Sequence, residues 1–415
     1  MTPAHDGVAR VLADAALRRI LTALDGDGEE TRVVGGAVRN ALMGLPVRDI
    51  DLTTTAAPQE TTRRARAAGL KVVPTGIEHG TVTVIVDGRP FEVTTLREDV
   101  ETDGRFAVVR FGRDFAMDAR RRDFTINALS VGADGEVRDY VGGLEDVAAR
   151  RVRFIGAADN RIREDYLRIL RFFRFFAEYA VGPIDQDGLR AAIAGREGLA
   201  RLSRERIRAE FVRLLAAPRA LETARLLAHS GLLDRLTGGV GDIGRLGRVV
   251  ANAGSDATLR LAAFDVMSEA DVNRLTERLR LSNAEAARLL GYARALAAMR
   301  GRHAVVDSLA LRRLSAEWGA RAVMDAAAAL RGEPSPVFAP DALAALEAGL
   351  DDPVMPLAGR DLVAAGLRPG PDLGQALEQA RAAWIEGGCL EGEGERERLL
   401  ALALSEVTQF GVAND

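Results

Sequence analysis

The spacing of hydrophobic residues follows two different patterns along the chain, and the pattern changes near residue 143. Before it, short runs such as 81–86 and 91–96 alternate between apolar and polar residues, which predicts β-strands. Asp87-Gly88 joins these two runs, and an Asp-Gly pair there is typical of a tight hairpin. We also expect a strand at 49–53 and helices at 37–43 and 59–68. The N-terminal part is therefore predicted to be α+β with a small mixed sheet.

After residue 143, apolar residues recur every three to four positions, as at Leu167, Leu170 and Phe173. This spacing is typical of amphipathic helices, and the alternation typical of strands is absent. Prolines at 334, 336 and 340 indicate a break. The remainder is therefore predicted to be all helical. We expect five segments, at 1–28, 29–140, 141–220, 221–335 and 336–415, the first of them helical.

The composition is that of a folded globular protein. The chain has 415 residues, of which 47% are hydrophobic and 28% charged, and no uncharged apolar run approaches the roughly 18 residues that cross a bilayer. We therefore expect a soluble protein with no membrane partner. A single cysteine, Cys389, excludes an intrachain disulfide and a cysteine-based zinc site. Since the N-terminus also lacks the pattern of a signal sequence, we expect a cytoplasmic location.

The positive charge is carried almost entirely by arginine. Lys71 is the one lysine among 56 basic residues, and the net charge is −4. A weakly negative net charge argues against a protein that coats nucleic acids without specificity, but it does not exclude a positively charged patch on part of the surface. The segment 150–174 contains eight arginines and three acidic residues. A biased genome explains the choice of arginine over lysine, but it does not explain this concentration.

Two acidic residues, Asp49 and Asp51, stand two positions apart on a predicted strand, so their carboxylates project from one face. Such a pair can hold Mg²⁺, which prefers oxygen ligands and is completed by water and phosphates. Upstream, Gly35 and Gly36 end a strand and open a helix, where backbone N–H groups suit a triphosphate. Arg39 lies one turn later and can reach the same anion. Taken alone, the acidic pair also fits a solvated strand edge, and the glycine pair an ordinary tight turn.

A third carboxylate, Glu92, lies on the second strand of the predicted hairpin, on the face opposite Phe91 and Val93. That face is either the solvated side of the hairpin or part of the metal cluster. We favour the cluster, because three acidic positions on short strands beside a glycine turn suit two-metal phosphoryl transfer.

Five motifs follow one another between about residues 30 and 220. They are Gly35-Gly36-Ala37-Val38-Arg39, Asp49-Ile50-Asp51, Arg121-Arg122-Asp123-Phe124-Thr125-Ile126-Asn127-Ala128, Asp139-Tyr140-Val141-Gly142-Gly143 and the segment 164–175, which begins Glu164-Asp165-Tyr166-Leu167-Arg168. In this order they resemble the motifs of class II tRNA nucleotidyltransferases, the CCA-adding enzymes, and their bacterial poly(A) polymerase relatives. The resemblance implies a nucleotidyltransferase head with a five-stranded sheet at 29–140. It also implies a helical neck with a nucleotide-selecting helix, a helical body and a helical, RNA-binding tail in the three segments that follow.

The resemblance also implies roles for single residues. Asp49 and Asp51 would hold the metal ions, and Glu92 would be the third catalytic carboxylate. The nucleotide-binding residues would be Gly35, Gly36, Arg39, Arg122, Asp165, Arg168, Arg171 and Arg174. Asn40 departs from the family pattern, which usually has an aspartate after the arginine.

Asp165, Arg168, Arg171 and Arg174 recur every three residues, which on one helix forms a slanting row. A carboxylate and a guanidinium side by side can accept from an exocyclic amine and donate to a ring nitrogen, which fits cytosine and adenine but opposes uracil and guanine. The last two arginines would then face phosphates. Without the other motifs, such a row is more typical of a solvated helix face. The phenylalanines at 172, 173, 175 and 176 are predicted to be core residues.

We therefore expect a protein that adds CMP, CMP and AMP to the 3′ end of tRNA without a template, from CTP and ATP with Mg²⁺, and that releases pyrophosphate. The helical tail would contact the acceptor and elbow of the tRNA; the oligomeric state is left open. The stretch 94–119 is long for a connection, and the resemblance implies a flexible loop there that favours addition of the whole C-C-A. Poly(A) polymerase is the nearest alternative, and a non-catalytic RNA-binding protein is an alternative of another class.

Overall fold

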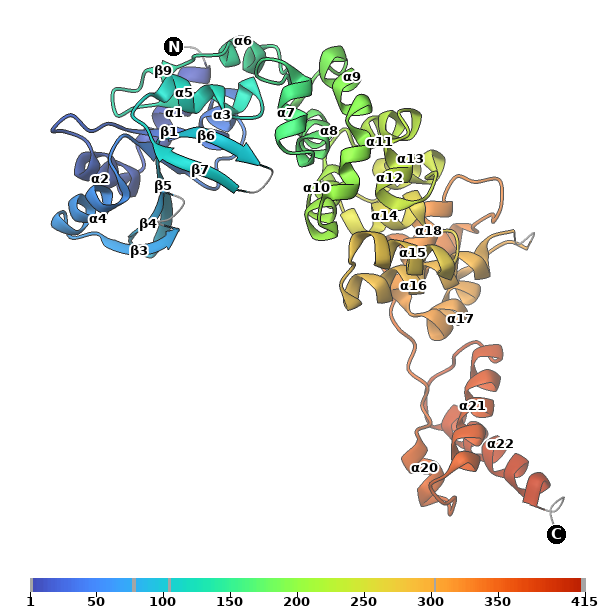
Figure 1. Ribbon diagram of the computed structural model, residues 1–415. Coiled ribbons are helices and arrows are strands. Elements are labelled where there is room, and N and C mark those ends of the chain that lie inside the picture. The colour runs from blue at the N-terminus through green and yellow to red at the C-terminus, as the bar shows by residue number, and fades with distance from the viewer. Residues whose placement is uncertain (1–2, 77–79, 104–105, 302–303, 412–415) are drawn as a thin grey trace. The chain divides into compact units, whose positions relative to one another are not determined.

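The computed structural model describes residues 3–76, 80–103, 106–301 and 304–411. The chain forms two compact units (Figure 1). The first unit comprises Met1–Thr223 and His229–Arg235, and the second comprises Ala224–Ala228 and Leu236–Asp415.

A mixed sheet of seven strands lies in the first unit, in the order β3-β4-β5-β2-β1-β8-β9. Only β2 and β5 run parallel among the paired strands that the structure describes in this sheet. The strands are β1 (Thr31–Val34), β2 (Asp51–Thr54), β3 (Lys71–Gly76), β4 (Thr81–Val86), β5 (Arg89–Thr95), β8 (Ser130–Val131) and β9 (Val137–Arg138). The mixed α+β fold is confirmed, but the expected count of five strands is wrong. Two of the seven strands, β8 and β9, have two residues each, too few to show an alternating pattern in the sequence.

The predicted hairpin between β4 and β5 is present, with Val86 paired to Arg89. Asp87 and Gly88 between them have φ of 50° and 80°. Positive φ at both central residues is the requirement of the tight turn that matches the twist of two antiparallel strands. The Asp-Gly pair therefore sets the register of this hairpin, and with it the position of Glu92.

The stretch 94–119 is not the long loop that we expected. It contains a separate two-stranded sheet of β6 (Arg97–Asp103) and β7 (Phe106–Phe111), followed by helix α5 (Phe115–Arg120). Alternation is weak in β6, where acidic residues recur at 98, 99, 101 and 103, and so the hairpin gives little signal in the sequence.

Helices lie on the sheet and continue the first unit, and the last of them is shared with the second unit through Ala224–Ala228. They are α1 (Pro3–Leu12), α2 (Ala15–Leu24), α3 (Gly36–Met43), α4 (Pro58–Ala67), α6 (Gly143–Ala148), α7 (Ala158–Glu164), α8 (Leu167–Tyr179), α9 (Gln186–Ala194), α10 (Arg204–Ala216) and α11 (Ala220–His229), with short 3₁₀ turns at Thr125–Asn127 and Arg196–Arg201. Asp14 caps α2 by accepting from the N–H groups of Ala16 and Leu17. The buried face of α2 includes Leu17 and Ile20 and packs towards the sheet and α4.

Helix α8 supplies much of the core beside the site. Phe172, Phe173 and Phe176 are fully buried, and the ring of Phe124 lies 5.1 Å from that of Phe175. Aromatic pairs at such distances stabilise a core beyond the area that they bury. The prediction that these phenylalanines are core residues is confirmed. Their packing fixes the orientation of the arginines that alternate with them.

The chain after α11 is helical, and no strand longer than an isolated bridge occurs in it within the described ranges. Its helices are α12 (Leu232–Thr237), α13 (Ile243–Asn252), α14 (Ala257–Asp265), α15 (Glu269–Leu279), α16 (Asn283–Met299), α17 (Ser308–Trp318), α18 (Ala320–Leu330), α19 (Pro340–Ala348), α20 (Gly359–Ala364), α21 (Pro371–Glu386) and α22 (Glu393–Gly411). Within the part of the chain that the structure describes, none of these or the earlier helices combines the length and apolarity needed to span a membrane.

Candidate functional site

The turn from β1 into α3 requires glycine at its first position. Gly35 has φ 67° and ψ −124°, a conformation that a residue with a side chain adopts only under strain. A Cβ atom there would also lie 3.1 Å from Nη1 of Arg122. The next residue, Gly36, begins α3, whose first turn has N–H groups without intrahelical acceptors. The turn is therefore open to an anion.

A cavity of about 570 Å³ lies beside this turn, and it gathers residues that are far apart in the sequence. Nine of the eleven predicted site residues line it. They are Gly35, Gly36, Arg39, Asp51, Arg122, Asp165, Arg168, Arg171 and Arg174. Six further residues complete the lining, namely Arg121, Asp123, Asn127, Leu167, Phe175 and Arg206. The two predicted residues that do not line it are Asp49 and Glu92.

Asp51 is the one of the three predicted catalytic carboxylates that lines this cavity. It begins β2, whereas Asp49 precedes the strand in the loop 44–50, so the expectation of both on one strand is wrong by two residues. Leu52 pairs with Val93 across the parallel strands β2 and β5, which places the preceding residues, Asp51 and Glu92, at neighbouring positions. Although Asp51 is exposed in part, loss of water around its carboxyl group raises its pKa, the carboxylates of Glu92 and Asp49 raise it further, and the charge of Arg122 opposes them.

None of the three carboxylates has an ion-pair partner among the described residues, although the charge of Arg122 acts on Asp51 from a longer distance. Asp49, Asp51 and Glu92 form no side-chain hydrogen bond or ion pair with any residue that the structure describes. Nor do the described residues include three His, Cys, Asp or Glu side chains close enough to hold a metal ion on their own. Carboxylates without an ion-pair partner, close enough that Asp49 and Glu92 raise the pKa of Asp51, fit a hard divalent cation whose remaining ligands are water and phosphate oxygens.

Arg122 is held from two sides at the edge of the cavity. Its Nη2 lies 3.1 Å from Oδ2 of Asp118, and its Nη1 donates to the backbone oxygen of Asn127 at 3.3 Å. Asp118 is buried in α5 and also pairs with Arg121. The Arg122 guanidinium is therefore fixed in place and remains partly exposed.

Arg39 is buried, with 6% of its surface exposed, and its hydrogen-bond acceptors are neutral. It donates to Oδ1 of Asn127 at 2.5 Å, to the hydroxyl of Tyr179 at 2.9 Å and to Oδ1 of Asn40 at 2.8 Å. Its guanidinium also lies 3.9 Å from the centre of the Tyr179 ring. Burial lowers the pKa of Arg39, since no carboxylate among the described residues hydrogen-bonds to it. A buried cation without an anion is costly, and this cost falls when an anion enters the cavity.

Asn40, the position that departs from the family pattern, joins two parts of the site. Its side-chain oxygen accepts from Arg39, and its Nδ2 donates to the backbone oxygen of Pro46 at 2.9 Å. An amide can do both, whereas a carboxylate can only accept. Asn40 therefore links Arg39 to the loop that carries Asp49.

Asp165 does not lie on the same helix as the arginines that follow it, which corrects the expected row of four. It stands between α7 and α8 with extended backbone, φ −153° and ψ 110°. Its Oδ1 accepts from the N–H of Leu167 at 3.0 Å, and its Oδ2 lies 2.6 Å from Nη2 of Arg206. Arg168, in the first turn of α8, pairs with Glu164 and donates to the backbone oxygen of Arg161. Asp165 and Arg168 still line one cavity, because the backbone oxygen of Asp165 accepts from the N–H of Arg168.

The two later arginines of α8 are paired with carboxylates. Arg171 Nη2 lies 2.6 Å from Oδ2 of Asp123, and Arg174 Nε lies 2.5 Å from Oε2 of Glu210. Arg174 is buried and pairs with Glu178 as well, at 2.8 Å. Burial opposes its charge, but the two carboxylates prevail and raise the pKa of Arg174. Arg174 is thus neutralised where Arg39 is not.

The sequence did not single out Asp123, Asn127 or Arg206 as site residues. Asp123 is buried, which opposes its ionisation, but the charge of Arg171 and the hydrogen bonds that it accepts lower its pKa. It links Arg171 to Asn127, and Asn127 in turn meets Arg39. Two of these residues stand within the motif 121–128 and could have been found there. Arg206 belongs to the segment 204–208, which has three arginines and one glutamate, and nothing in the sequence distinguishes it from the other arginines there.

Comparison with known proteins shows which proteins this chain resembles. A family model described as "Poly A polymerase head domain" matches residues 31–153, and one described as "Probable RNA and SrmB- binding site of polymerase A" matches 184–238. The chain is 41% identical over 263 residues to CCA tRNA nucleotidyltransferase 1, mitochondrial, of Danio rerio, covering 62% of this chain and 61% of that protein. It is 40% identical over 221 residues to the CCA-adding enzyme of Geobacillus thermodenitrificans, covering 53% of this chain and 54% of that protein.

A solved structure extends the likeness to the whole chain. The Bacillus stearothermophilus CCA-adding enzyme in complex with CTP superposes with a TM-score of 0.73 and 28% identity, covering 100% of both chains. The head region, residues 31–153, belongs to the family of poly(A) polymerase head domains, and the chain as a whole shares its fold with a CCA-adding enzyme. Membership in this nucleotidyltransferase family implies use of a divalent metal ion. The matched region spans about three fifths of the Danio rerio protein and about half of the Geobacillus thermodenitrificans one.

Proposed function

We propose that the protein adds CMP, CMP and AMP to the 3′ end of tRNA, from CTP and ATP and without a nucleic-acid template, releasing pyrophosphate. The observation that carries this proposal is the cavity of about 570 Å³, which brings a glycine turn, an unpaired carboxylate and the Asp165–Arg168 pair together. A triphosphate, a reacting α-phosphate and a base edge each find complementary groups there. The resemblance in sequence to CCA-adding enzymes supports the same substrates.

Asp49 and Asp51 would hold Mg²⁺, with Glu92 as the neighbouring carboxylate. A pair of such ions lowers the pKa of a primer hydroxyl and balances the charge of a leaving pyrophosphate. Arg39 and Arg122 bind the triphosphate from the side of α3. Of these, Arg39 gains the most from an anion, since its partners among the described residues are neutral. Asp51 and the α3 turn line the same cavity, so bound triphosphate and carboxylate would face each other.

Asp165 and Arg168 select the base. Asp165 accepts from the N4 amine of cytosine or the N6 amine of adenine, while Arg168 donates to the adjacent ring nitrogen. Each oxygen of Asp165 has one hydrogen bond in place, from the N–H of Leu167 or from Arg206, and each keeps a further acceptor position. Uracil and guanine would place a carbonyl oxygen against the carboxylate, which costs a few kcal/mol and so about 10² in selectivity.

Arg171 and Arg174 are proposed to act near the phosphates. Their carboxylate partners hold them at the cavity wall, so their contribution is smaller than that of Arg39. The helices after α11 would hold the acceptor and elbow of the tRNA. A cytoplasmic location completes the proposal, and cell fractionation tests it.

The decisive experiment is incubation with tRNA that lacks its 3′ C-C-A, with each labelled nucleotide in turn and with Mg²⁺. Products that lengthen by two residues with CTP, and by three with CTP and ATP together, support the proposal. Long adenosine tracts would indicate poly(A) polymerase, the activity after which the matching head-domain family is described. Two added cytidines and no adenosine would mean that a second enzyme completes the end.

The variant Asp51→Ala tests whether the proposed site carries out catalysis. It should abolish addition with every nucleotide while the far-UV circular dichroism spectrum and the Tm stay near those of the wild type, because Asp51 is exposed and lies at the edge of β2. Near-normal turnover by this variant would disprove the assigned site. If the wild-type protein incorporates no nucleotide in the presence of a divalent metal ion, the result would favour a non-catalytic RNA-binding protein instead.

A further inference from the structure

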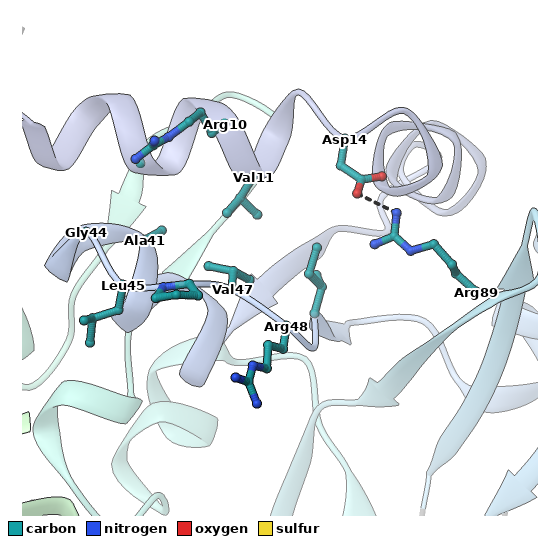
Figure 2. A pocket seen from close by; sticks show the side chains of 12 residues that line it. Arg10, Val11, Asp14, Ala41, Gly44, Leu45, Val47, Arg48 and Arg89 are labelled. Atoms are coloured by element: carbon teal, nitrogen blue, oxygen red, sulfur yellow. Dashed lines mark hydrogen bonds and ion pairs between the residues drawn. The ribbon is translucent and has the colours of Figure 1, made fainter. Parts of the chain in front are cut away.

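A second cavity, of about 450 Å³, borders the same loop that carries Asp49 (Figure 2). Its walls come from α1, from the N-cap of α2, from the end of α3, from the loop 44–50 and from the first residue of β5. None of its lining residues lines the site cavity. It is therefore a separate hollow of the first unit.

The chain passes from the second cavity to the site cavity between Ile50, the last residue of the loop, and Asp51, the first residue of β2. Arg48 and Ile50 line the second cavity, whereas Asp51 lines the site cavity. Asp49 stands between the two lining residues Arg48 and Ile50. A chain that fills the second cavity would thus pass within one or two residues of the carboxylates that surround the reaction.

The charge of the second cavity is positive. Arg10, Arg48 and Arg89 line it together with a single acidic residue, Asp14. Arg89 donates to Oδ2 of Asp14 at 2.8 Å, so this pair is neutral. The side chains of Arg10 and Arg48 are exposed, and neither forms an ion pair or hydrogen bond with a residue in the described ranges. Two cations therefore remain available to an anionic ligand.

The wall between these cations is apolar. In the view of Figure 2, Val11 and Val47 lie between the side chains of Arg10 and Arg48, and a dashed line joins Asp14 to Arg89. Leu45, Pro46 and Ile50 extend this wall. A basic rim around an apolar wall suits single-stranded nucleic acid, whose phosphates meet the cations and whose bases lie against apolar surface.

We propose that this cavity binds the single-stranded 3′ end of the RNA acceptor, with phosphates at Arg10 and Arg48 and a base or ribose against the wall of Val47 and Pro46. The inference rests on the proposed function, because it is the RNA hydroxyl that must reach Asp49 and Asp51. A free nucleoside triphosphate is a poorer occupant, since the site cavity already offers the groups that bind it.

The test compares the double variant Arg10→Gln/Arg48→Gln with Arg18→Gln/Arg66→Gln. The control removes two exposed arginines of the same unit that line neither of these cavities. With tRNA lacking its C-C-A as the probe, the KM for RNA should rise about tenfold in the first variant, with kcat and the KM for CTP unchanged. The slope of log binding constant against log salt, measured by fluorescence anisotropy, should fall by about 1.4, since each lost contact to a single strand removes about 0.7.

A substitution that removes a negative charge from the second cavity provides a test with the opposite expected effect on RNA binding. Asp14→Asn keeps an N-cap side chain for α2 but removes the negative charge that neutralises Arg89. It should tighten RNA binding about threefold and steepen the salt slope.

Three outcomes overturn the proposal. One is an unchanged KM for RNA in the double variant, another is a rise in the KM for CTP in place of that for RNA, and the third is weaker RNA binding by Asp14→Asn. Each would be measured in protein that still adds nucleotides, which separates it from failure of the proposed function. A wild-type protein that extends no tRNA would disprove both.

Discussion

Arg206 Nη2 lies 2.6 Å from Oδ2 of Asp165, although the two residues are 41 positions apart and belong to different elements. Asp165 also accepts from the N–H of Leu167 through its other oxygen. The carboxylate proposed to read the base is therefore oriented by one backbone group and one side chain. On the neighbouring position, Glu164 orients Arg168 in the same way. The base-reading pair is thus held before any nucleotide arrives, which lowers the entropy cost of binding.

Replacing Arg206 with methionine should weaken selection of the base. Without the guanidinium, Asp165 keeps its backbone hydrogen bond but can rotate its second oxygen away from the base. We expect the ratio of kcat/KM for CTP to that for UTP to fall about tenfold, with a smaller change in kcat for CTP. Nucleotide incorporation measured with each of the four triphosphates gives this ratio.

The matched control is Arg213→Met, which removes an exposed arginine of the same helix α10 that does not line the cavity. It should leave the ratio unchanged. Arg206→Lys should restore part of the ratio because it keeps the positive charge. Equal ratios in Arg206→Met and the wild type would show that Arg206 does not position Asp165.

Arg39 and Arg174 are both buried arginines at one cavity, but their substitutions should have different effects. Arg174 pairs with Glu210 and Glu178, so Arg174→Met leaves Glu178 without its cation and leaves Glu210 only the longer contact with Arg171, at 3.9 Å. Breaking a buried ion pair from one side costs about 3–5 kcal/mol, and the Tm should fall accordingly. Arg39 has neutral hydrogen-bond partners, so Arg39→Met should change the Tm little.

The same two variants should also differ in their KM for the nucleotide substrates. Arg39→Met should raise the KM for CTP and for ATP at least tenfold, because it removes the cation that has no carboxylate hydrogen-bonded to it. Differential scanning fluorimetry and incorporation kinetics on both variants check the prediction. A larger loss of stability in Arg39→Met than in Arg174→Met would contradict it.

The sequence predicted the elements that have strong periodic patterns. The hairpin around Asp87-Gly88 and the helix that carries Phe172 and Phe173 occur as expected, because an Asp-Gly turn and a 3.6-residue period are local signals. The strands β8 and β9 were missed because two residues cannot show an alternation. The hairpin of β6 and β7 was missed because acidic residues interrupt its pattern.

Motif order selected the candidate site residues, but it did not predict which side chains they pair with. Nine of eleven residues line one cavity, which agrees with a motif series read as a single site. Their pairing depends on long-range contacts. Nothing local distinguishes Arg174, which two carboxylates neutralise, from Arg39, whose acceptors are neutral. The break in the row at Asp165 depends on the backbone between α7 and α8, which spacing alone does not reveal.

The ion pair of Asp123 with Arg171 should make stability depend on pH. The pKa of Asp123 is lowered from 3.8, since the charge of Arg171 and the hydrogen bonds outweigh burial. A carboxyl with a lowered pKa stabilises the folded state above its unfolded pKa, and this contribution disappears as the pH falls through the lowered value. Asp123→Asn should therefore cost about 2 kcal/mol at pH 7 and progressively less below pH 3.8.

Thermal unfolding of both proteins between pH 7 and pH 3 measures this difference. Asp159→Asn is the matched control, because Asp159 is exposed and forms no ion pair with any described residue. The control should follow the wild type at every pH. A gap between Asp123→Asn and the wild type that stays constant down to pH 3 would mean that the lost contact is not the ionic one.

Gly35 should be the least replaceable glycine of the α3 turn. At φ 67° and ψ −124° an alanine is strained, and its Cβ would meet Nη1 of Arg122 at 3.1 Å. Gly69 also has a positive φ, 73°, but a Cβ there would meet nothing within 4 Å. Gly69→Ala should therefore cost about 1 kcal/mol and leave activity intact, whereas Gly35→Ala should cost about 2 kcal/mol or more. Since the added methyl group displaces Arg122, Gly35→Ala should also raise the KM for CTP several-fold. Urea unfolding and incorporation kinetics on the two variants measure these effects, and equal losses in both would show that only the backbone conformation, and not the contact with Arg122, requires glycine at position 35.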